Sequence, residues 1–322
     1  MPGPQLALAL WLLGAATQSA ANAAPLQALQ ALQALQALQA LQVQQVAAGV
    51  FVHFGRPLDL EAPGHDDIAN IGFIVGSRCV AVIDTGGSVR VGRALLAAIR
   101  QRTQKPICYV INTHVHVDHV LGNAAFKDSH ASFIGHAALP AAIARSRPYF
   151  LQHYPEDLDP PASAEQIIAP DRGVQDRLEL DLGDRRLQLR AWPVAHTDCD
   201  LSVLDESTRT LFTGDLLFRQ RLPAVDGDVG GWLKVIDELA HMPVKRAIPG
   251  HGPLTMDLES ALVPERRYLR ALLEGVRSAI DLGQSLPEAI DGVAASEKSQ
   301  WLLWDSTHPR NVTRVYDQLE WQ

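Results

Sequence analysis

Charge is missing from the start of this chain. Residues 1–55 contain no Lys, Arg, Asp or Glu, so all 28 basic and 36 acidic residues, with a net charge of −8, lie between Arg56 and Gln322. In that charged region no apolar run reaches the ~18–20 residues that span a bilayer, and no Lys/Arg run gives an electrostatic reason to expect nucleic-acid binding. A hydrophobic content of 47% excludes an intrinsically disordered chain. These absences leave a globular protein with room for a large core.

The uncharged start divides into two segments. Residues 6–16 form an apolar run too short to span a membrane, and Ala21-Asn22-Ala23 then gives the small-residue pattern of a secretory cleavage site. We therefore predict a signal peptide over residues 1–23 and a periplasmic or secreted protein. The alternatives are an uncleaved apolar helix and a wrongly placed start codon. Residues 24–45 contain a Leu-Gln-Ala repeat whose period of three spreads leucine around a helix, so we interpret them as a low-complexity spacer before a domain over residues 46–322.

Cysteine is scarce, with Cys79, Cys108 and Cys199 as its three occurrences. An exported protein can form disulfides, but three cysteines at these spacings match no disulfide framework. Cys79 and Cys108 lie in apolar, strand-like runs, so we predict buried thiols at both positions. Cys199 follows a candidate ligand histidine by three residues, and we predict a free thiol that lies beside the site.

Strand-like and helical patterns alternate through the domain. β-branched and aromatic runs predict strands, and apolar residues spaced by three and four predict helices. The predicted strands are 50–54, 71–75, 79–83, 107–111, 131–134, 178–180, 186–192, 201–205 and 210–213. The predicted helices are 89–102, 137–144, 232–239, 258–282 and 310–319. Two strand-rich halves with helices between them predict two sheets packed face to face and covered by helices, with residues 149–171 as a long loop or lid.

Four potential metal ligands fall within six residues in the segment His114-Val115-His116-Val117-Asp118-His119. The segment follows the predicted strand 107–111. Alternation along an extended loop would put His114, His116 and Asp118 on one side, with His119 at the start of the next helix. Imidazole and carboxylate groups suit a divalent ion such as zinc.

Three more candidate ligands occur further along the chain. His196, Asp215 and His251 each follow a short apolar run, at 186–192, 210–212 and 247–248. Because the ends of such strands can meet at one rim of the sheets, we expect these side chains to join the first segment. The alternative is a His-rich surface loop without metal, and the three additional motifs argue against it.

The ordered set of motifs resembles the metallo-β-lactamase superfamily. The motifs are HxHxDH at 114–119, His196, Thr-Gly-Asp at 213–215 and Pro-Gly-His-Gly at 249–252. The resemblance implies an α+β fold, an αββα sandwich of two mixed β-sheets flanked by helices, with two zinc ions at the sheet edges. It implies one zinc ion on His114, His116 and His196, a second on Asp118, His119 and His251, and Asp215 as the bridge. Iron and manganese are the other metals to consider.

Further segments resemble the exported quinoprotein relay system zinc metallohydrolases, which are SoxH-related. These segments are 67–73, 81–88 and 214–218, the pairs Asp226-Gly227 and Gly231-Trp232, and the C-terminal segments 310–313 and 319–321. The resemblance implies a periplasmic role near PQQ-dependent alcohol oxidation, with a quinoprotein system as the partner. The motifs specify no substrate and no oligomeric state.

A dinuclear zinc site predicts a hydrolase that uses metal-bound hydroxide on a small-molecule ester, thioester, lactone or amide. Asp118 is the candidate catalytic residue, because a ligand carboxylate can also orient the nucleophile or accept its proton. Asp84, at the end of a predicted strand, is either a hydrogen-bond partner of a ligand histidine or a turn residue.

Two other functions stay open. One is a true metallo-β-lactamase, which Asp215 disfavours because the resemblance implies Cys or Ser there in such enzymes. The other is a non-hydrolytic metal-binding accessory protein of a periplasmic redox system. Around the site, Tyr149, Phe150 and Tyr154 are either a substrate wall or a loop anchor, and we predict a structural role for His136.

Overall fold

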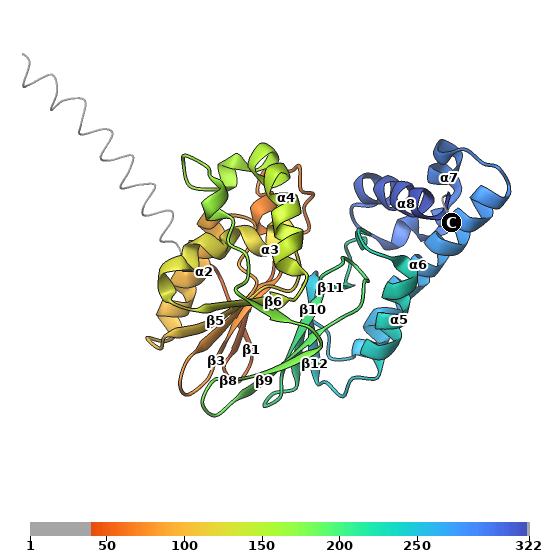
Figure 1. The fold of residues 1–322 in the computed structure, drawn as a ribbon. Helices are drawn as coiled ribbons and strands as arrows, with labels where there is room; N and C mark the ends of the chain where they lie inside the picture. The colour runs from red at the N-terminus through yellow and green to blue at the C-terminus, as the bar shows by residue number, and fades with distance from the viewer. Residues whose placement is uncertain (1–39, 321–322) are drawn as a thin grey trace, which may run out of the picture.

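The fold is a sandwich of two β-sheets between two layers of helices (Figure 1). The computed structural model describes residues 40–320. The predicted signal peptide and residues 24–39 of the predicted spacer lie outside the described residues. Both sheets contain parallel and antiparallel neighbours, so the predicted α+β architecture of two mixed sheets flanked by helices is confirmed. None of the described helices combines the length and apolar character that crossing a membrane requires.

The first sheet has seven strands in chain order. They are β1 Gln44–Ala47, β2 Val50–His53, β3 Ile71–Val75, β4 Val80–Ile83, β5 Ile107–Ile111, β6 Ser132–His136 and β7 Arg172–Val174. The strands β1 to β4 run antiparallel to their neighbours, and β4 to β7 are parallel. The parallel strands are joined through helices, which brings the carboxyl ends of β4 and β5 to the same edge.

The second sheet has five strands in the order β12, β11, β10, β9, β8. Their bounds are β8 Arg177–Asp181, β9 Arg186–Ala191, β10 Leu201–Asp205, β11 Thr210–Phe218 and β12 Arg246–His251. β11 and β12 are parallel, and the other pairs are antiparallel. The end of β12 therefore lies beside the end of β11, at the edge where the sheet meets the carboxyl ends of β4 and β5.

Helices cover the outer face of each sheet. The α-helices are α2 Val89–Arg102, α3 Val117–Val120, α4 Leu139–His153, α5 Val229–Ala240, α6 Leu258–Asp281, α7 Leu286–Gly292 and α8 Trp304–Glu320. Short 3-10 helices lie at His65–Asp67, Leu121–Ser129, Pro155–Asp157, Ala164–Gln166 and Ala295–Gln300. Helices α2 to α4 belong to the first sheet's side, and α5 to α8 form the other layer (Figure 1).

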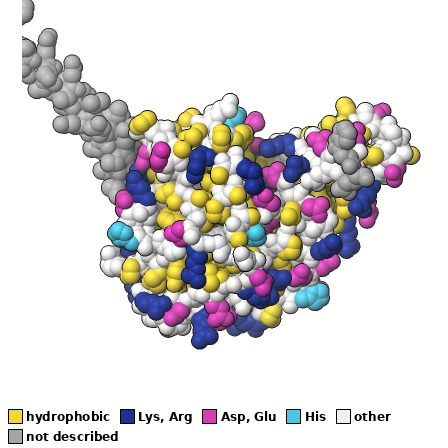
Figure 2. Space-filling view, in the orientation of Figure 1, with side chains coloured by type: hydrophobic (Ala, Val, Ile, Leu, Met, Phe, Trp, Pro, Cys, Tyr) yellow, Lys and Arg dark blue, Asp and Glu magenta, His cyan; other side chains and the backbone are white. Residues whose placement is uncertain are grey.

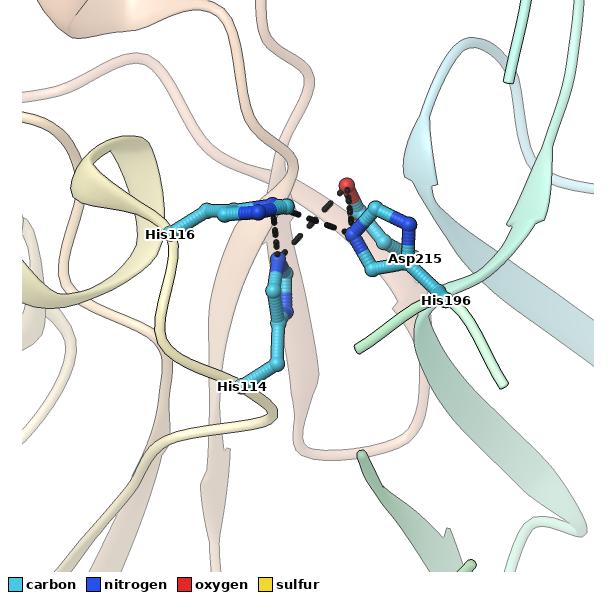
Figure 3. A group of neighbouring side chains, drawn as sticks. All are labelled: His114, His116, His196 and Asp215. Atoms are coloured by element: carbon cyan, nitrogen blue, oxygen red, sulfur yellow. Dashed lines mark hydrogen bonds and ion pairs between the residues drawn. The ribbon is translucent and has the colours of Figure 1, made fainter. Parts of the chain in front are cut away.

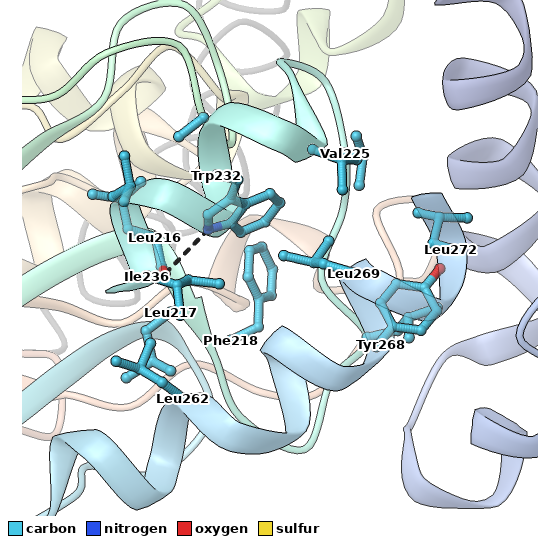
Figure 4. Packing of buried hydrophobic residues seen from close by; sticks show 14 of the residues in the cluster. Leu216, Leu217, Phe218, Val225, Trp232, Ile236, Leu262, Tyr268, Leu269 and Leu272 are labelled. Carbon is cyan, nitrogen blue, oxygen red and sulfur yellow. Dashed lines mark hydrogen bonds between the residues drawn. The ribbon is translucent and has the colours of Figure 1, made fainter. Parts of the chain in front are cut away.

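The core has an inner layer and outer layers because each sheet is buried on both faces. Between the sheets, Ile74, Ile83 and Ile111 pack in one cluster with Val203 and Phe212. Neighbouring strand residues point the other way and pack on α2, so strands such as Val80–Ile83 are apolar throughout rather than alternating. On the far side, Trp232, Leu269 and Phe218 join α5 and α6 to β11 (Figure 4).

Most predicted elements differ from the structure by some residues at one or both ends, and the predicted helix 310–319 already begins at Trp304. Helix α4 continues to His153 through Pro148, where a loop was predicted from residue 149, because Leu139, Ile143 and Phe150 are buried in one cluster. Strand β11 extends beyond residue 213 to Phe218, with a register shift at Gly214. The sheet also begins earlier than predicted, since β1 pairs Gln45 with Phe51.

The two buried thiols predicted at Cys79 and Cys108 are wrong, because the structure joins these residues in a disulfide. Cys79 directly precedes β4, and Cys108 lies on the neighbouring parallel strand β5, where Val80 pairs with Ile107. This places the two Cα atoms 5.8 Å apart, within the range that a disulfide requires. The pairing is a consequence of sheet order, which cysteine spacing alone does not give.

Removing this disulfide is expected to destabilise the fold. The bond closes a loop with a sequence separation of 29, so the double variant Cys79→Ser/Cys108→Ser should lose about 2–4 kcal/mol of unfolding free energy. Urea denaturation of the oxidised wild type and the variant measures the difference. Thiol titration of the denatured, unreduced wild type should find one thiol, that of Cys199; three thiols would contradict the pairing.

Candidate metal centre

All seven predicted ligand residues lie together at the edge where the two sheets meet. The first sheet supplies His114 in the loop after β5, His116 at the N-cap of α3, and Asp118 and His119 within α3. The second sheet supplies His196 from the loop between β9 and β10, Asp215 from within β11, and His251 at the end of β12. Their donor atoms form two neighbouring groups, His114, His116, His196 and Asp215 in one, and Asp118, His119 and His251 in the other.

The first group brings three imidazole nitrogens together (Figure 3). His116 Nδ1 lies 3.1 Å from His114 Nε2 and 3.0 Å from His196 Nε2. Asp215 Oδ2 completes the group, at 3.4 Å from His196 Nε2 and 3.7 Å from His114 Nε2. Three nitrogens at such distances cannot all be satisfied by hydrogen bonds with one another, and their lone pairs converge on one point.

The second group lies on the other side of the Asp215 carboxylate. Asp118 Oδ2 is 3.3 Å from His251 Nε2 and 3.6 Å from His119 Nε2. Asp215 Oδ1 is 3.3 Å from His119 Nε2, and its Oδ2 is 3.3 Å from His251 Nε2. Asp215 therefore faces both groups, which is the position that a bridging ligand needs.

Segment 114–119 is not one extended loop, so the prediction that His114, His116 and Asp118 lie on one side is wrong. The chain enters α3 at Val117, and the turn of the helix separates Asp118 from His114 and His116. Asp118 and His119 consequently face the second group. Because the segment turns into a helix at Val117, its six residues supply ligands to both groups.

Each candidate histidine fixes its orientation through its other ring nitrogen. The outward contacts are His114 Nδ1 to Thr113 Oγ1 at 3.0 Å, His116 Nε2 to Asp226 Oδ2 at 2.6 Å, His119 Nδ1 to Asp84 Oδ2 at 2.8 Å, His196 Nδ1 to the Ala224 carbonyl at 2.8 Å and His251 Nδ1 to the Ile68 carbonyl at 2.9 Å. An outward N–H donor leaves the inward nitrogen with a free lone pair. Such outer contacts are typical of histidines that ligate a metal.

Atoms without partners show that the donor set fits cations. Buried His119 Nε2 and Asp215 Oδ1 make no hydrogen bond, although unpaired buried polar atoms are costly. Burial and the nearby His116 lower the pKa of His196 to about 4, so its imidazole is neutral near pH 7. Burial favours protonated Asp215, but His251, His119 and His114 overcome it and hold the pKa of Asp215 well below its usual value. Burial disfavours a charged His119, but Asp215 and Asp118 outweigh it and raise the pKa of His119 well above its usual value. A bound divalent ion would displace that proton, because metals bind neutral imidazoles and ionised carboxylates.

Asp84 supports this centre from a strained position after β4. Its φ of 53° lies in the left-handed region, which is uncommon for a residue other than glycine. Its carboxylate accepts from the Thr113 N–H and hydroxyl, both at 2.8 Å, as well as from His119. Of the two roles predicted for Asp84, the structure thus shows the contact with a candidate ligand histidine.

A close approach explains the glycine before His251. A Cβ on Gly250 would lie 1.7 Å from Asp215 Oδ1, so a larger side chain would displace the carboxylate that faces both groups. Asn70 holds the same loop, because its side-chain amide donates to the carbonyls of Pro249 and Gly252 at 2.8 and 2.7 Å. Asn70 was not among the predicted site residues, and its polar side chain at the start of an apolar strand was the available signal.

Asp226 is a second residue that the ligand prediction missed. Its carboxylate accepts from His116 Nε2, and the backbone around it is tied to the loop of another ligand by bonds from the Asp226 and Gly227 N–H groups to the His196 carbonyl. Asp226 lies two residues before Asp228, the N-cap of α5. The conspicuous Asp-Gly-Asp sequence at 226–228 indicated a turn, but the partner of its first carboxylate depends on the tertiary fold.

A cleft of about 560 Å³ opens onto the two groups. His116, Asp118, Asp215 and His251 lie at its floor, and residues of α4 and α8 form opposite walls. Tyr149, Phe150 and Tyr154 all line it, which favours the substrate-wall interpretation, although Phe150 also packs in the core. Basic and acidic side chains are interspersed on the face drawn in Figure 2.

Two residues near the centre are not part of either group. Cys199 is a free, buried thiol as predicted, and it packs with Val117 and Ile143 in an apolar cluster. Burial raises the pKa of the Cys199 thiol, which keeps it protonated. His136 ends β6, and its Nδ1 accepts from the Ala138 N–H at 3.0 Å, a local structural contact.

Comparison with protein families agrees with the geometry. Residues 65–251 match the family model described as Metallo-beta-lactamase superfamily. The match begins after β2 and ends at His251, so it includes all seven residues of the two groups. None of the curated proteins compared with this chain matches its sequence.

Solved structures share the fold at low sequence identity. A metallo-beta-lactamase family protein from Thermus thermophilus is 19% identical with a TM-score of 0.63, and the match covers 86% of this chain and 94% of that one. A metallo-beta-lactamase from Pontibacter korlensis is 18% identical with a TM-score of 0.58, over 71% and 99%. A sec-alkylsulfatase from Pseudomonas sp. is 17% identical with a TM-score of 0.63, over 87% of this chain but 50% of its own. The present chain thus spans about half the length of that sulfatase.

Truncation of Asp226 is expected to weaken metal binding without unfolding the protein. Asp226→Ala removes the acceptor that orients His116, so the affinity for zinc should fall about 10–100-fold. Competition with a chromophoric chelator measures the affinity. Asp317→Ala is the matched control, because Asp317 is another carboxylate that lines the same cleft. Equal losses in both variants would contradict a specific role of Asp226.

Proposed function

The chain belongs to the Metallo-beta-lactamase superfamily, and from this premise we propose that it is a hydrolase with two zinc ions that cleaves a small-molecule ester, thioester, lactone or amide. The observation that carries the proposal is the set of five histidines whose inward nitrogens converge around Asp215 while every outward nitrogen is hydrogen-bonded. Buried imidazoles are usually hydrogen-bonded, so the unusual feature is on the inner side, where His119 Nε2 and Asp215 Oδ1 have no partner among the described residues.

The ligand assignment follows the two groups. His114, His116 and His196 would hold one ion, and Asp118, His119 and His251 the other, with Asp215 between them. Imidazole and carboxylate donors suit zinc, and iron or manganese are the alternatives. Two such ions would supply Lewis-acid activation of the substrate carbonyl and of a water molecule.

The protein's own residues then have separate roles. Asp118 lies at the cleft floor, where its carboxylate can orient the attacking water or hold its proton. Asp84, Asp226 and the Ile68 carbonyl fix the ligand rings, so the donor geometry exists before substrate arrives. Phe150 and Tyr154 line the cleft with aromatic surface that can exclude water from the bound substrate.

Metal removal is expected to abolish hydrolysis. The purified protein should contain about two metal ions per chain, and dialysis against a chelator should remove activity that zinc restores. His116→Ala should lower the metal content, because it deletes a donor of the first group. Elemental analysis and a panel of nitrophenyl esters, thioesters, lactones and alkyl sulfates measure both properties. Absence of bound metal, or unchanged metal content in His116→Ala, would contradict the proposal.

The same panel separates the other two functions. Nitrocefin hydrolysis that exceeds ester and thioester hydrolysis and is lost with a chelator would assign a β-lactamase. Two bound metal ions with no turnover of any substrate would assign a non-hydrolytic metal-binding accessory protein. Asp215 and the complete donor set support the hydrolase over both.

We further propose that the protein is exported and acts in the periplasm beside PQQ-dependent alcohol oxidation. The apolar run at residues 6–16 and the Ala21-Asn22-Ala23 pattern support export. The Cys79–Cys108 disulfide supports it too, because structural disulfides are typical of oxidising compartments. The association with a quinoprotein system is supported by the sequence segments that resemble the quinoprotein relay system metallohydrolases, Asp226-Gly227 and Gly231-Trp232 among them.

Export gives a direct prediction about the mature chain. When the full-length gene is expressed in a bacterium with a periplasm, the protein should fractionate with the periplasmic contents and begin at Ala24. Cell fractionation and N-terminal sequencing test both statements. A chain that retains Met1 and remains with the cytosolic fraction would overturn the export proposal without affecting the hydrolase.

A further inference from the structure

Arg221 is a buried arginine with no carboxylate of the described residues within ion-pair distance. Its exposed fraction is 8%, and within residues 40–320 the structure records no ion pair for it. Its Nε atom has no hydrogen-bond partner. A buried guanidinium without a carboxylate partner is costly, so an anion bound in the cleft would stabilise it.

The one side-chain contact of Arg221 does not satisfy it. Its Nη1 lies 3.2 Å from His251 Nδ1, but that nitrogen also lies 2.9 Å from the Ile68 carbonyl. Since a carbonyl only accepts, His251 Nδ1 must carry the proton and donate to Ile68, and it then has no lone pair for Arg221. The guanidinium therefore keeps donors free at the floor of the cleft, which it lines together with His251 and Asp118.

Strained backbone fixes this arginine in place. Arg221 pairs with Leu302 in an isolated bridge, through bonds from the Leu222 N–H to the Leu302 carbonyl and from the Leu302 N–H to the Gln220 carbonyl. On each side of the bridge a non-glycine residue has positive φ, 66° at Gln220 and 61° at Leu303. Strain of this kind persists where the surrounding structure requires it, and it clusters at ligand-binding positions.

A second arginine faces the same cleft. Arg310 lies on α8 and lines the wall opposite the aromatic residues of α4, and within the described residues it too is recorded in no ion pair. The nearest metal-site carboxylates, Asp118 and Asp215, belong to the candidate ligand groups, so bound cations would neutralise them. Asp59, Asp226 and Asp317 also line the cleft, but within the described residues none of them lies within ion-pair distance of Arg221 or Arg310. Guanidinium donors of both arginines therefore stay open to a bound anion.

We propose that Arg221 and Arg310 bind a carboxylate on the substrate, so that the enzyme prefers esters or thioesters whose acyl chain carries a second, free carboxylate. This proposal rests on the proposed hydrolase function and adds the substrate class. The planar fork of a guanidinium matches a carboxylate in bidentate geometry, and a buried fork gains more from that contact than an exposed one. Arg221 would fix the anion near the floor and Arg310 would close on it from α8.

Two esters of equal acyl length test the preference. Mono-4-nitrophenyl glutarate carries a free carboxylate, and 4-nitrophenyl pentanoate does not. The zinc-loaded wild type should have a kcat/KM about 10–100-fold higher for the glutarate ester, as expected for a charge-assisted hydrogen bond. Arg221→Gln and Arg310→Gln should lose most of this preference while changing the pentanoate reaction by less than about threefold. Arg221→Lys should recover only part of it, because lysine lacks the fork.

Controls separate anion binding from damage to the site. Arg270→Gln changes an exposed arginine of α6 outside the cleft and should behave as wild type. Because Arg221 adjoins His251, elemental analysis must show unchanged zinc in its variants. Calorimetric titration with glutaramate and with neutral glutaramide measures binding without turnover, provided that an assay for released ammonia shows that neither amide is hydrolysed. Glutaramate should bind the wild type about 10–100-fold more tightly than either Gln variant.

The outcomes distinguish this proposal from the proposed function. If the zinc-loaded protein hydrolyses neither these esters nor any substrate of the panel above, the hydrolase proposal fails, and the glutaramate titration still decides whether the arginines bind a carboxylate. If both esters are hydrolysed equally well, or both lose activity equally in Arg310→Gln, the hydrolase stands and the carboxylate proposal is overturned. Equal binding of glutaramate and glutaramide by the wild type would also overturn it.

Discussion

The buried carboxylate of Asp215 is the constraint on which the site depends. It lies within 3.7 Å of the inward nitrogens of four histidines, and its Oδ1 has no hydrogen-bond partner. Burial of an ionised carboxylate is costly unless cations join it. The two sheets therefore have to meet at one edge. The elements around this edge must hold the ligand side chains close together, although some of their polar atoms have no hydrogen-bond partner there.

The architecture meets this requirement by making the outer contacts rigid. Asp84 is held in a left-handed conformation after β4, where one carboxylate reaches both Thr113 and His119. On the opposite sheet, the register shift at Gly214 and the absence of a side chain on Gly250 let β11 and β12 bring Asp215 beside His251. The hydrophobic cluster around Trp232 and Phe218 then supports the second sheet's ligands, since Phe218 stacks on His251 with centroids 5.1 Å apart.

The sequence was sufficient for the features that depend on local pattern. Strand 71–75, helix 89–102 and strand 107–111 have the predicted bounds, and all seven predicted ligand residues lie in the two groups. What it did not give are contacts between residues distant in the chain. Cys79 meets Cys108 because β4 and β5 are neighbours, Asp226 meets His116 across 110 residues, and Arg221 pairs with Leu302 in an isolated bridge. Helix α4 passes Pro148 because packing outweighs the local preference.

The candidate ligands and the walls of the cleft come from different parts of the chain. The family match ends at His251, so the metal-site residues lie within it, while α6, α7 and α8 lie beyond it. Yet α8 forms a wall of the cleft, and Leu302 fixes the backbone of Arg221. Substitutions in these C-terminal helices can therefore change the shape of the cleft without touching a candidate ligand. The fold brings the two candidate ligand groups together, and one of the walls above them, α8, lies outside the part that the family model covers.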